Sequence, residues 1–169
     1  MANGKVLVIM GSDSDLPVIE KCFKILKQFD IEFEAHIASA HRTPAKAMAL
    51  ASNAKDNGFK VIIAAAGMAA HLAGVIAANT TLPVIGIPCK GGALNGVDAL
   101  YATVQMPTGI PVATVAIDGA ANAGVLAAQI IALGDDELAA KLKEYKEGLA
   151  SAVEGKDEAL QQKIADMEV

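Results

Sequence analysis

Short apolar runs alternate along the chain with longer segments in which apolar residues recur at helical spacing, a pattern typical of a parallel sheet covered by helices. The predicted strands cover residues 5–10, 32–37, 60–66, 83–87 and 112–117. The predicted helices cover residues 15–29, 43–57, 70–79, 96–105, 120–133 and 135 to about 150, before a polar tail that is expected to fray. We therefore expect one α/β domain over residues 1–169, a three-layer flavodoxin-like sandwich with a parallel five-stranded sheet of order 2-1-3-4-5 and a C-terminal helix.

Local signals refine this pattern. The strand at 32–37 alternates apolar with polar residues, whereas the others are mostly apolar throughout, so we expect it at the edge of the sheet. Pro17 and Pro44 fall near two predicted helix starts and Gly58 follows a predicted helix end, which agrees with the positions that these residues favour.

The predicted helix at 120–133 is apolar on nearly all sides. Such a helix should not face water, and contact between subunits is one way to cover it, so we expect a homo-oligomer. The alternative is a core helix that is fully buried within a monomer.

Composition narrows the possible partners. The chain has 169 residues, 53% of them hydrophobic, and a net charge of −5. Residues from 135 onward include ten acidic and five basic side chains, so the negative charge lies in the C-terminal segment. An acidic chain with no Trp is a poor candidate for binding nucleic acid.

The sequence also suggests where the protein works. No apolar stretch reaches the roughly 18 residues that span a bilayer, and the apolar run at 6–10 is too short for a signal peptide, so we expect a cytoplasmic protein without a membrane partner. Cys22 and Cys89 are expected to be reduced and structural.

Three polar segments each follow a predicted strand: GSDSD at 11–15, SAHRTP at 39–44 and GMAAH at 67–71. Ligands of parallel α/β sheets bind at the carboxyl ends of strands, where the strand order reverses. With the order 2-1-3-4-5, the three segments meet at one crevice, and this convergence is stronger evidence for a site than any one motif.

The first segment combines a glycine turn, two serine hydroxyls and a helix N-terminus that suits an anion. A simpler interpretation makes Ser14 or Asp15 a helix N-cap and nothing more. Asp13 and Asp15 also invite comparison with the Asp-x-Asp nucleophile of magnesium-dependent phosphatases, although Gly11 and Ser12 separate them from the strand.

The second segment places an imidazole beside a guanidinium: His41 can transfer a proton near neutral pH, and Arg42 can bind a phosphate. Alternatively, His41 is merely exposed, and in either case Thr43 is expected to cap the helix that begins at Pro44. His71, in the third segment, is as consistent with a hydrogen-bonded structural histidine as with a functional one.

Other polar and sulfur-containing side chains receive no functional role. His36 lies on the polar face of the edge strand, and Met68 and Met106 are expected to be packing residues.

These segments, together with GVDALYATVQMPTGIPV at 96–112, resemble the PurE family of purine biosynthesis. The resemblance is collinear from about residue 6 to 133. Arg42 in the second segment and the AAHL sequence that ends at Leu72 resemble class I, the N-carboxyaminoimidazole ribonucleotide mutases, rather than the class II carboxylases.

The resemblance implies an isomerase that moves a carboxylate from the exocyclic nitrogen of an aminoimidazole ribonucleotide to the neighbouring ring carbon. It implies that carbon dioxide is released and recaptured inside the site, without a metal, biotin or nucleotide cofactor. It also implies a homo-octamer. The alternatives are direct carboxylation by carbon dioxide, a magnesium-dependent phosphatase, and a module that binds the nucleotide without changing it.

Site residues follow from the same resemblance. His41 becomes the general acid and base, and Ser12 and Asp15 hold the nucleotide. Ser39 and Arg42 bind its phosphate. The remaining residues, which would cradle the carboxylate or the trapped carbon dioxide, are Gly67, Ala70 and His71.

Two departures from the family pattern stand out. Ala73 occupies a position where many relatives have proline, which affects rigidity more than chemistry. The segment CKGGAL at 89–94 is a glycine-rich version of a variable loop, and it could alter closure over the substrate.

Overall fold

The computed structural model describes residues 4–167 and contains the predicted parallel sheet. Its strands, in the spatial order β2-β1-β3-β4-β5, are β1 (Lys5–Met10), β2 (Glu32–Ile37), β3 (Phe59–Gly67), β4 (Val84–Cys89) and β5 (Ala113–Thr114). The predicted strand order is confirmed. The strand β2 lies at the edge of the sheet, as its alternating pattern predicted.

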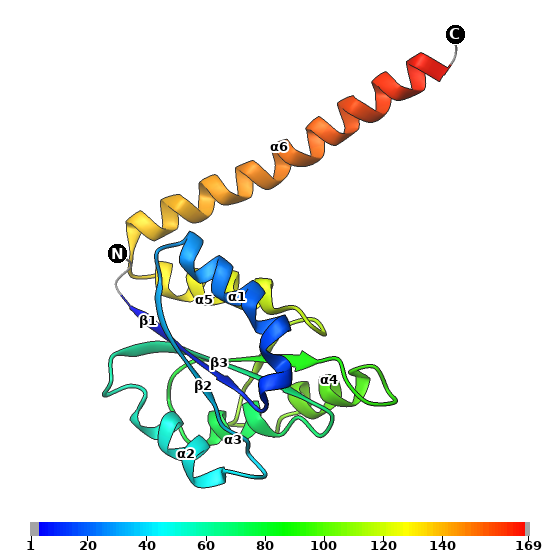
Figure 1. Ribbon diagram of the computed structural model, residues 1–169. Helices are drawn as coiled ribbons and strands as arrows, with labels where there is room; N and C mark the ends of the chain where they lie inside the picture. The colour runs from blue at the N-terminus through cyan, green and yellow to red at the C-terminus, as the bar shows by residue number, and fades with distance from the viewer. Residues whose placement is uncertain (1–3, 168–169) are drawn as a thin grey trace.

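Helices cover both faces of this sheet (Figure 1). They are α1 (Leu16–Gln28), α2 (Pro44–Asn53), α3 (Leu72–Ala78), α4 (Val97–Val104), α5 (Ala120–Ala132) and α6 (Asp136–Met167). One face carries α1 and α5 and the other carries α2 and α3, so alternate residues of β1 enter two separate cores. Val6 and Val8 pack under α1 and α5, whereas Leu7 and Ile9 pack toward α2 and α3.

Most predicted elements are present, but several are shorter. The strand predicted at 112–117 pairs with β4 only at Ala113 and Thr114, because the segment after it turns away and keeps isolated hydrogen bonds, among them Val115 N–H to the Gly86 carbonyl at 3.1 Å. The helix predicted at 43–57 ends at Asn53. Turns follow it up to Gly58, whose positive φ of 84° is a conformation that glycine adopts readily.

The helix α5 is largely covered within one chain. Six of its residues are buried, and Gly124 lies where α1 crosses closely: a Cβ atom there would come within 2.9 Å of Ile25 Cγ2 and 3.2 Å of the Cys22 carbonyl. Packing inside the chain therefore covers part of the apolar surface of α5, whereas Val125, Leu126 and Ile130 are only partly buried.

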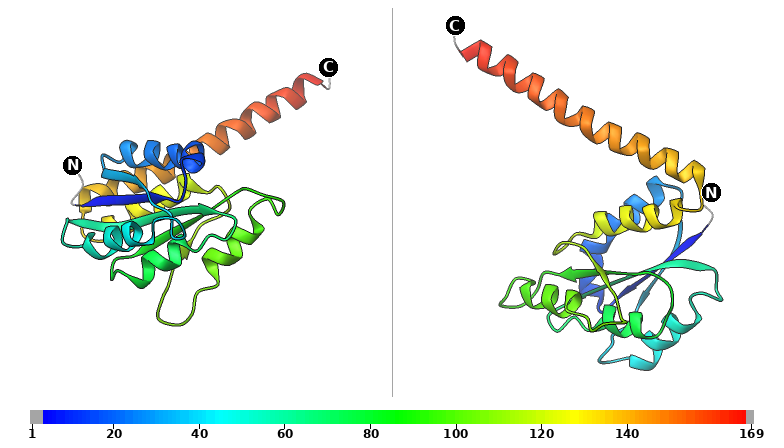
Figure 2. Two further views of the ribbon diagram at one scale, coloured as in Figure 1. Left: turned by 60° about the horizontal axis from the view of Figure 1, so that its bottom comes forward. Right: turned by 180° about the vertical axis from the view of Figure 1, so that it is seen from behind.

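The C-terminal helix is longer than predicted. It was expected to end near residue 150 before a fraying tail, but α6 continues without interruption to Met167 and projects away from the sheet (Figures 1 and 2). Its distal half is rich in Ala, Leu, Glu, Lys and Gln and contains no proline, which favours a continuous helix. Side-chain pairs at i,i+4 spacing add support, such as Gln162 Nε2 to Asp166 Oδ1 at 2.9 Å.

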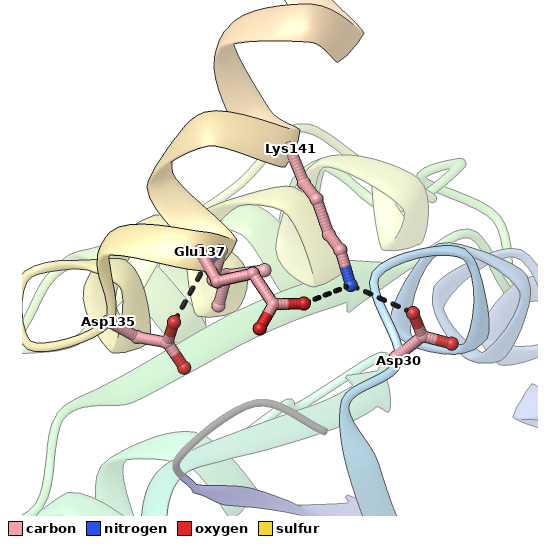
Figure 3. Close-up of polar contacts among 5 residues, drawn as sticks. Asp30, Asp135, Glu137 and Lys141 are labelled. Carbon is pink, nitrogen blue, oxygen red and sulfur yellow. Dashed lines mark hydrogen bonds and ion pairs between the residues drawn. The ribbon is translucent and has the colours of Figure 1, made fainter.

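The first turns of α6 attach it to the sandwich. Leu138 and Leu142 are buried in the core on the α1 and α5 side, and the ring of Tyr145 packs edge-on against Phe29. Lys141 Nζ lies 3.0 Å from Asp30 Oδ2 and 3.2 Å from Glu137 Oε1, and Asp135 Oδ1 accepts a hydrogen bond from Leu138 N–H (Figure 3). Because the ion pairs are exposed, we attribute most of the attachment to the buried leucines.

The close crossing of α1 and α5 predicts that Gly124→Ala is destabilising. Overpacking costs about 1–3 kcal/mol, which outweighs the roughly 1 kcal/mol that alanine gains over glycine in a helix. Gly148→Ala in α6 is the matched control, because nothing lies within 4 Å of its added Cβ, and it should raise the free energy of unfolding by about 0.5–1 kcal/mol. Urea denaturation of both variants measures this difference, and equal effects of the two substitutions would contradict the packing argument.

Candidate active site

The loops that follow β1, β2, β3 and β4 enclose a cavity of about 680 Å³ at the carboxyl edge of the sheet. The three polar segments singled out in the sequence therefore meet, as the strand order required. The cavity is lined by Gly11, Ser12, Ser14, Asp15, Ser39, Ala40, His41, Arg42, Ala66, Gly67, Met68, Ala69, His71, Leu72, Lys90 and Gly91.

The loop after β1 is held by a reciprocal cap around a short 3-10 turn, Asp13–Asp15. Ser12 Oγ accepts a hydrogen bond from Ser14 N–H at 3.3 Å, and Asp15 Oδ2 accepts one from Ser12 N–H at 3.1 Å. Asp15 is the N-cap residue of α1, as one interpretation of the sequence expected, but its side chain bonds back to Ser12 and makes no cap bond to α1, whereas Ser12 caps the 3-10 turn. Capping and cavity lining coexist here, because both Ser12 and Asp15 also face the cavity.

Partial burial raises the pKa of the Asp15 carboxyl above its ordinary value of 3.8. The hydrogen bond from Ser12 N–H acts in the opposite direction but is the smaller effect. Burial also raises the pKa of the neighbouring Cys89 thiol to about 12, with the charges of Asp15 and Asp118 adding to the shift. Cys89 is therefore a protonated thiol at neutral pH and not a nucleophile.

The loop after β2 is ordered by Ser39 and Thr43. Ser39 Oγ accepts hydrogen bonds from His41 N–H at 3.3 Å and from Arg42 N–H at 3.1 Å. Thr43 was expected to cap α2, but its side chain makes no cap bond there. Instead Thr43 Oγ1 accepts from Ser39 N–H at 2.8 Å and donates to the Ser39 carbonyl, which closes the loop on itself. Pro44 begins α2 as predicted.

Arg42 connects this loop to the first one. Its guanidinium donates to the Gly11 carbonyl at 3.1 Å, across from the loop after β2 to the loop after β1. Since a guanidinium has five N–H donors, this bond leaves most of them available to a ligand. The side chain lines the cavity with a permanent positive charge.

In the loop after β3, small residues bring the backbone close to the cavity. A Cβ atom at Gly67 would meet the Cys89 carbonyl at 3.3 Å, so a larger residue is disfavoured there. Met68 was expected to be a packing residue. Instead it is 62% exposed and lines the cavity, and its φ is +55°. Ala70 is 1% exposed and lies behind the cavity wall, which Ala69 forms instead.

The two histidines of the second and third segments touch each other. His41 Nε2 lies 2.9 Å from His71 Nδ1, with the rings nearly perpendicular at 83°. This contact needs one hydrogen between the two nitrogens, so one ring donates and the other accepts. The contact engages one nitrogen of each ring, and which of the two donates depends on the tautomers.

Sequence reasoning assigned no role to two residues on the β4 side of the cavity, Lys90 and Gly91. A signal was present, because they belong to the glycine-rich segment after the fourth strand, which was noted only for its possible effect on closure. Lys90 adds a second basic residue to the cavity lining, on the side of the sheet away from β2.

Within residues 4–167, no group of three or more His, Cys, Asp and Glu side chains is arranged to hold a metal ion. Asp13 and Asp15, the pair that suggested a phosphatase, are both engaged with Ser12: Asp13 Oδ1 accepts from Ser12 Oγ, and Asp15 Oδ2 accepts from its N–H. Within the same residues, no helix is long and apolar enough to cross a membrane.

Known proteins are similar to this chain in sequence. A family described as AIR carboxylase matches residues 5–152. The chain is 53% identical over 158 residues to the N5-carboxyaminoimidazole ribonucleotide mutase of Thermotoga maritima, covering 94% of this chain and 92% of that protein. It is 54% identical over 138 residues to the phosphoribosylaminoimidazole carboxylase of Candida glabrata, covering 82% of this chain and 24% of that protein.

A solved structure supports the fold assignment. The crystal structure of Treponema denticola PurE matches with a TM-score of 0.83 at 32% identity, and the match covers 93% of this chain and 98% of that one. The sheet order and layers described above are therefore those of a structurally characterised fold.

The raised pKa of Asp15 predicts a pH dependence of stability. A carboxyl whose pKa is raised on folding favours the folded state fully below its unfolded pKa, and this contribution is lost as the pH rises through the folded pKa. Asp15→Asn keeps an oxygen that can accept from Ser12 N–H but cannot ionise. The variant should therefore gain stability relative to the parent between about pH 3.5 and pH 7, measured by urea denaturation; a difference that does not change with pH would contradict this.

Proposed function

Because the chain belongs to the AIR carboxylase family, we propose that it is a mutase of de novo purine biosynthesis: it moves a carboxylate from the exocyclic nitrogen of an aminoimidazole ribonucleotide to the adjacent ring carbon. One observation carries the proposal. A single cavity brings together two histidines in contact, a guanidinium and a half-buried carboxylate, from three separate loops. The mutases of Thermotoga maritima and Pyrococcus abyssi match more than four-fifths of the chain.

His41 is the general acid and base in this proposal. When the carbamate C–N bond breaks, carbon dioxide leaves and His41 gives a proton to the exocyclic nitrogen. The ring carbon, which is enamine-like, then attacks the carbon dioxide. His41 finally removes the proton from that ring carbon, which restores the aromatic ring and returns the histidine to its starting state. The contact with His71 orients the imidazole of His41 and places one hydrogen between the two rings.

The protein must also retain the carbon dioxide between the two steps. Gly67 and Ala69 provide a wall of backbone and methyl groups, which leaves room for a small apolar guest. Holding both fragments in one cavity makes the recombination effectively unimolecular. Our proposal therefore assigns retention to these small residues and proton transfer to His41.

The polar loops supply the groups that hold the nucleotide. Asp15 accepts hydrogen bonds from ribose hydroxyls, and Ser12 contributes a further polar contact. Ser39 Oγ accepts from two backbone N–H groups, which leaves its own hydroxyl hydrogen for the phosphate. Arg42 supplies the charge and several donors beside it.

Direct carboxylation of the unmodified aminoimidazole ribonucleotide by carbon dioxide is a second candidate. It is favoured by the fungal relatives, which are named carboxylases, although the chain covers only 24% of the Candida glabrata protein. The two candidates share the site and differ in the source of carbon dioxide.

One experiment separates these functions. The protein is incubated with the synthetic carbamate ribonucleotide, or with the unmodified ribonucleotide and bicarbonate, each with and without EDTA, and the ultraviolet spectrum is followed. Conversion of the carbamate at low enzyme concentration, insensitive to EDTA, supports the mutase. Conversion only with bicarbonate supports the carboxylase, EDTA-sensitive phosphate release supports a phosphatase, and binding without conversion overturns an enzymatic function.

The proposal includes a homo-octamer acting in the cytoplasm. The apolar stripe of α6 supports assembly: Leu138 and Leu142 are buried, but the same stripe continues at 11-residue intervals through Leu149 and Leu160, and through Val153 and Ile164. These four distal residues are between 42% and 64% exposed, and a second copy of the chain is the occupant that we propose for them. The buried, free thiols of Cys22 and Cys89 suit a reducing compartment.

The role of His41 predicts that His41→Asn lowers kcat by about 10²–10⁴-fold, because positioning cannot replace a proton donor and acceptor. Steady-state kinetics with the carbamate ribonucleotide measures this, and circular dichroism checks that the fold is kept. His36→Asn is the matched control, because His36 lies on the edge strand outside the cavity lining and should retain the parent activity. Near-normal turnover of His41→Asn would remove His41 from the mechanism.

The phosphate role of Arg42 predicts a binding defect. Arg42→Ala should raise KM by about 10-fold or more, because it removes charge-assisted hydrogen bonds worth about 1.5–3 kcal/mol. Arg42→Lys keeps the charge but loses the planar guanidinium, so its KM should lie between those of the parent and Arg42→Ala. Calorimetric titration with the ribonucleotide, in parallel with its dephosphorylated nucleoside, tests the assignment. An equal loss of affinity for both ligands would contradict a phosphate contact.

A further inference from the structure

The β4 side of the cavity depends on a residue that does not line it. The ladder between β3 and β4 ends with the pair Gly67 and Cys89, and β5 pairs with β4 only as far as Gly86. Lys90 is therefore the first residue beyond the sheet on this strand, and neither neighbouring strand pairs with its backbone. Yet Lys90 and Gly91 form part of the cavity wall.

Asp118 supplies the missing connection. Its carboxylate Oδ1 accepts a hydrogen bond from Lys90 N–H at 2.8 Å, and its own N–H donates to the Pro88 carbonyl at 2.9 Å. The two bonds bracket the end of β4 at the point where the chain leaves the sheet. They replace the ladder that a longer fifth strand would have provided.

The backbone of Asp118 is arranged for this contact. Its φ is +56°, in the left-handed region that few residues other than Gly, Asn and Asp adopt readily. The turn continues at Gly119, where a Cβ atom would lie 2.8 Å from the Ala116 carbonyl. The turn thus needs a residue that tolerates this conformation, and of the three that do, aspartate also supplies a charged acceptor.

The cavity wall that Asp118 holds carries charge. Arg42 lies on the β2 side of the cavity and Lys90 on the β4 side, so basic residues line both flanks. A carbamate ribonucleotide has two anionic groups, the phosphate and the carboxylate. With Arg42 assigned to the phosphate, Lys90 is the cation left for the second anionic group.

We propose that Asp118 is a positioning residue, which acts through the backbone of Lys90 to hold the Lys90–Gly91 wall, and with it the Lys90 ammonium, against the carboxylate of the substrate. This inference rests on the proposed function for the identity of the substrate. Asp118 touches no reacting atom in this scheme. In the proposed mechanism the substrate carboxylate loses its charge as carbon dioxide leaves, so a cation held against it stabilises the bound substrate more than the transition state. The loss of Asp118 should therefore raise KM without lowering kcat.

A matched pair of substitutions isolates the hydrogen bond. Asp118→Gly keeps the left-handed backbone but removes the acceptor, whereas Asp118→Asn tolerates the same backbone and keeps an oxygen at Oδ1. Both remove the negative charge, so they differ in the acceptor. We expect Asp118→Gly to raise KM by about 10-fold without lowering kcat, and Asp118→Asn to recover most of the lost affinity.

Lys90 provides the second arm of the test. Lys90→Gln alone should raise KM, and combining it with Asp118→Gly should raise KM no further than the larger single effect, because Asp118 acts through Lys90. Full additivity in the double variant would overturn the proposal. So would equal KM values for the parent chain, Asp118→Gly and Asp118→Asn, or a fall in kcat with unchanged KM.

A readout independent of turnover separates this inference from the proposed function. Amide hydrogen exchange at Lys90 should be faster in Asp118→Gly than in Asp118→Asn, and the aminoimidazole ribonucleotide should slow it in the parent chain. If the parent converts no carbamate but Lys90 shows this protection, the function fails and the positioning role stands. If turnover is normal and exchange at Lys90 is the same in both variants, the positioning role fails and the function stands.

Discussion

Parallel pairing places the carboxyl ends of all five strands at one edge of the sheet, and everything at the site depends on this constraint. Helices cover both faces of the sheet, so the inner strands are buried and their polar neighbours lie beyond the strand ends. Because β1 lies between β2 and β3, the loops after these strands open toward the same crevice. The cavity is a consequence of strand order before it is a property of particular residues.

The loops divide their polar groups between structure and chemistry. Ser39, Thr43 and Asp118 use side-chain oxygens to accept backbone N–H groups that no strand or helix satisfies. This fixes the loops without using the ring of His41, which contacts His71, or most of the Arg42 guanidinium. One residue can have both a structural and a functional position: Ser12 caps a turn and also lines the cavity.

Small residues govern how closely the layers and loops approach. Gly124 lets α1 and α5 cross, Gly86 lies beneath Thr103 and Val112 with no room for a Cβ atom, and Gly67 lies against the backbone of β4. Small residues also line the cavity on the β3 side, where Ala66, Gly67 and Ala69 form part of its wall. Glycine and alanine therefore account both for the close packing of the layers and for this part of the cavity wall.

The sequence by itself determined the layer architecture, the edge position of β2 and the three loops of the site. Apolar periodicity predicts each helix and strand from local sequence, and in a parallel sheet the loops after neighbouring strands lie at the same edge. Strand order predicted that the loops carrying His41, Arg42 and Asp15 converge, and the family resemblance supplied the roles of these residues. The contact between His41 and His71 could not be predicted, because it depends on how two loops thirty residues apart are oriented. The cavity-facing position of Met68 and the hydrogen bond from Lys90 to Asp118 likewise belong to the tertiary structure. The hydrogen-bond partner of a residue at a strand end, and whether its φ is positive, depend on neighbours that are distant in sequence. A periodic pattern of apolar residues carries no information about them.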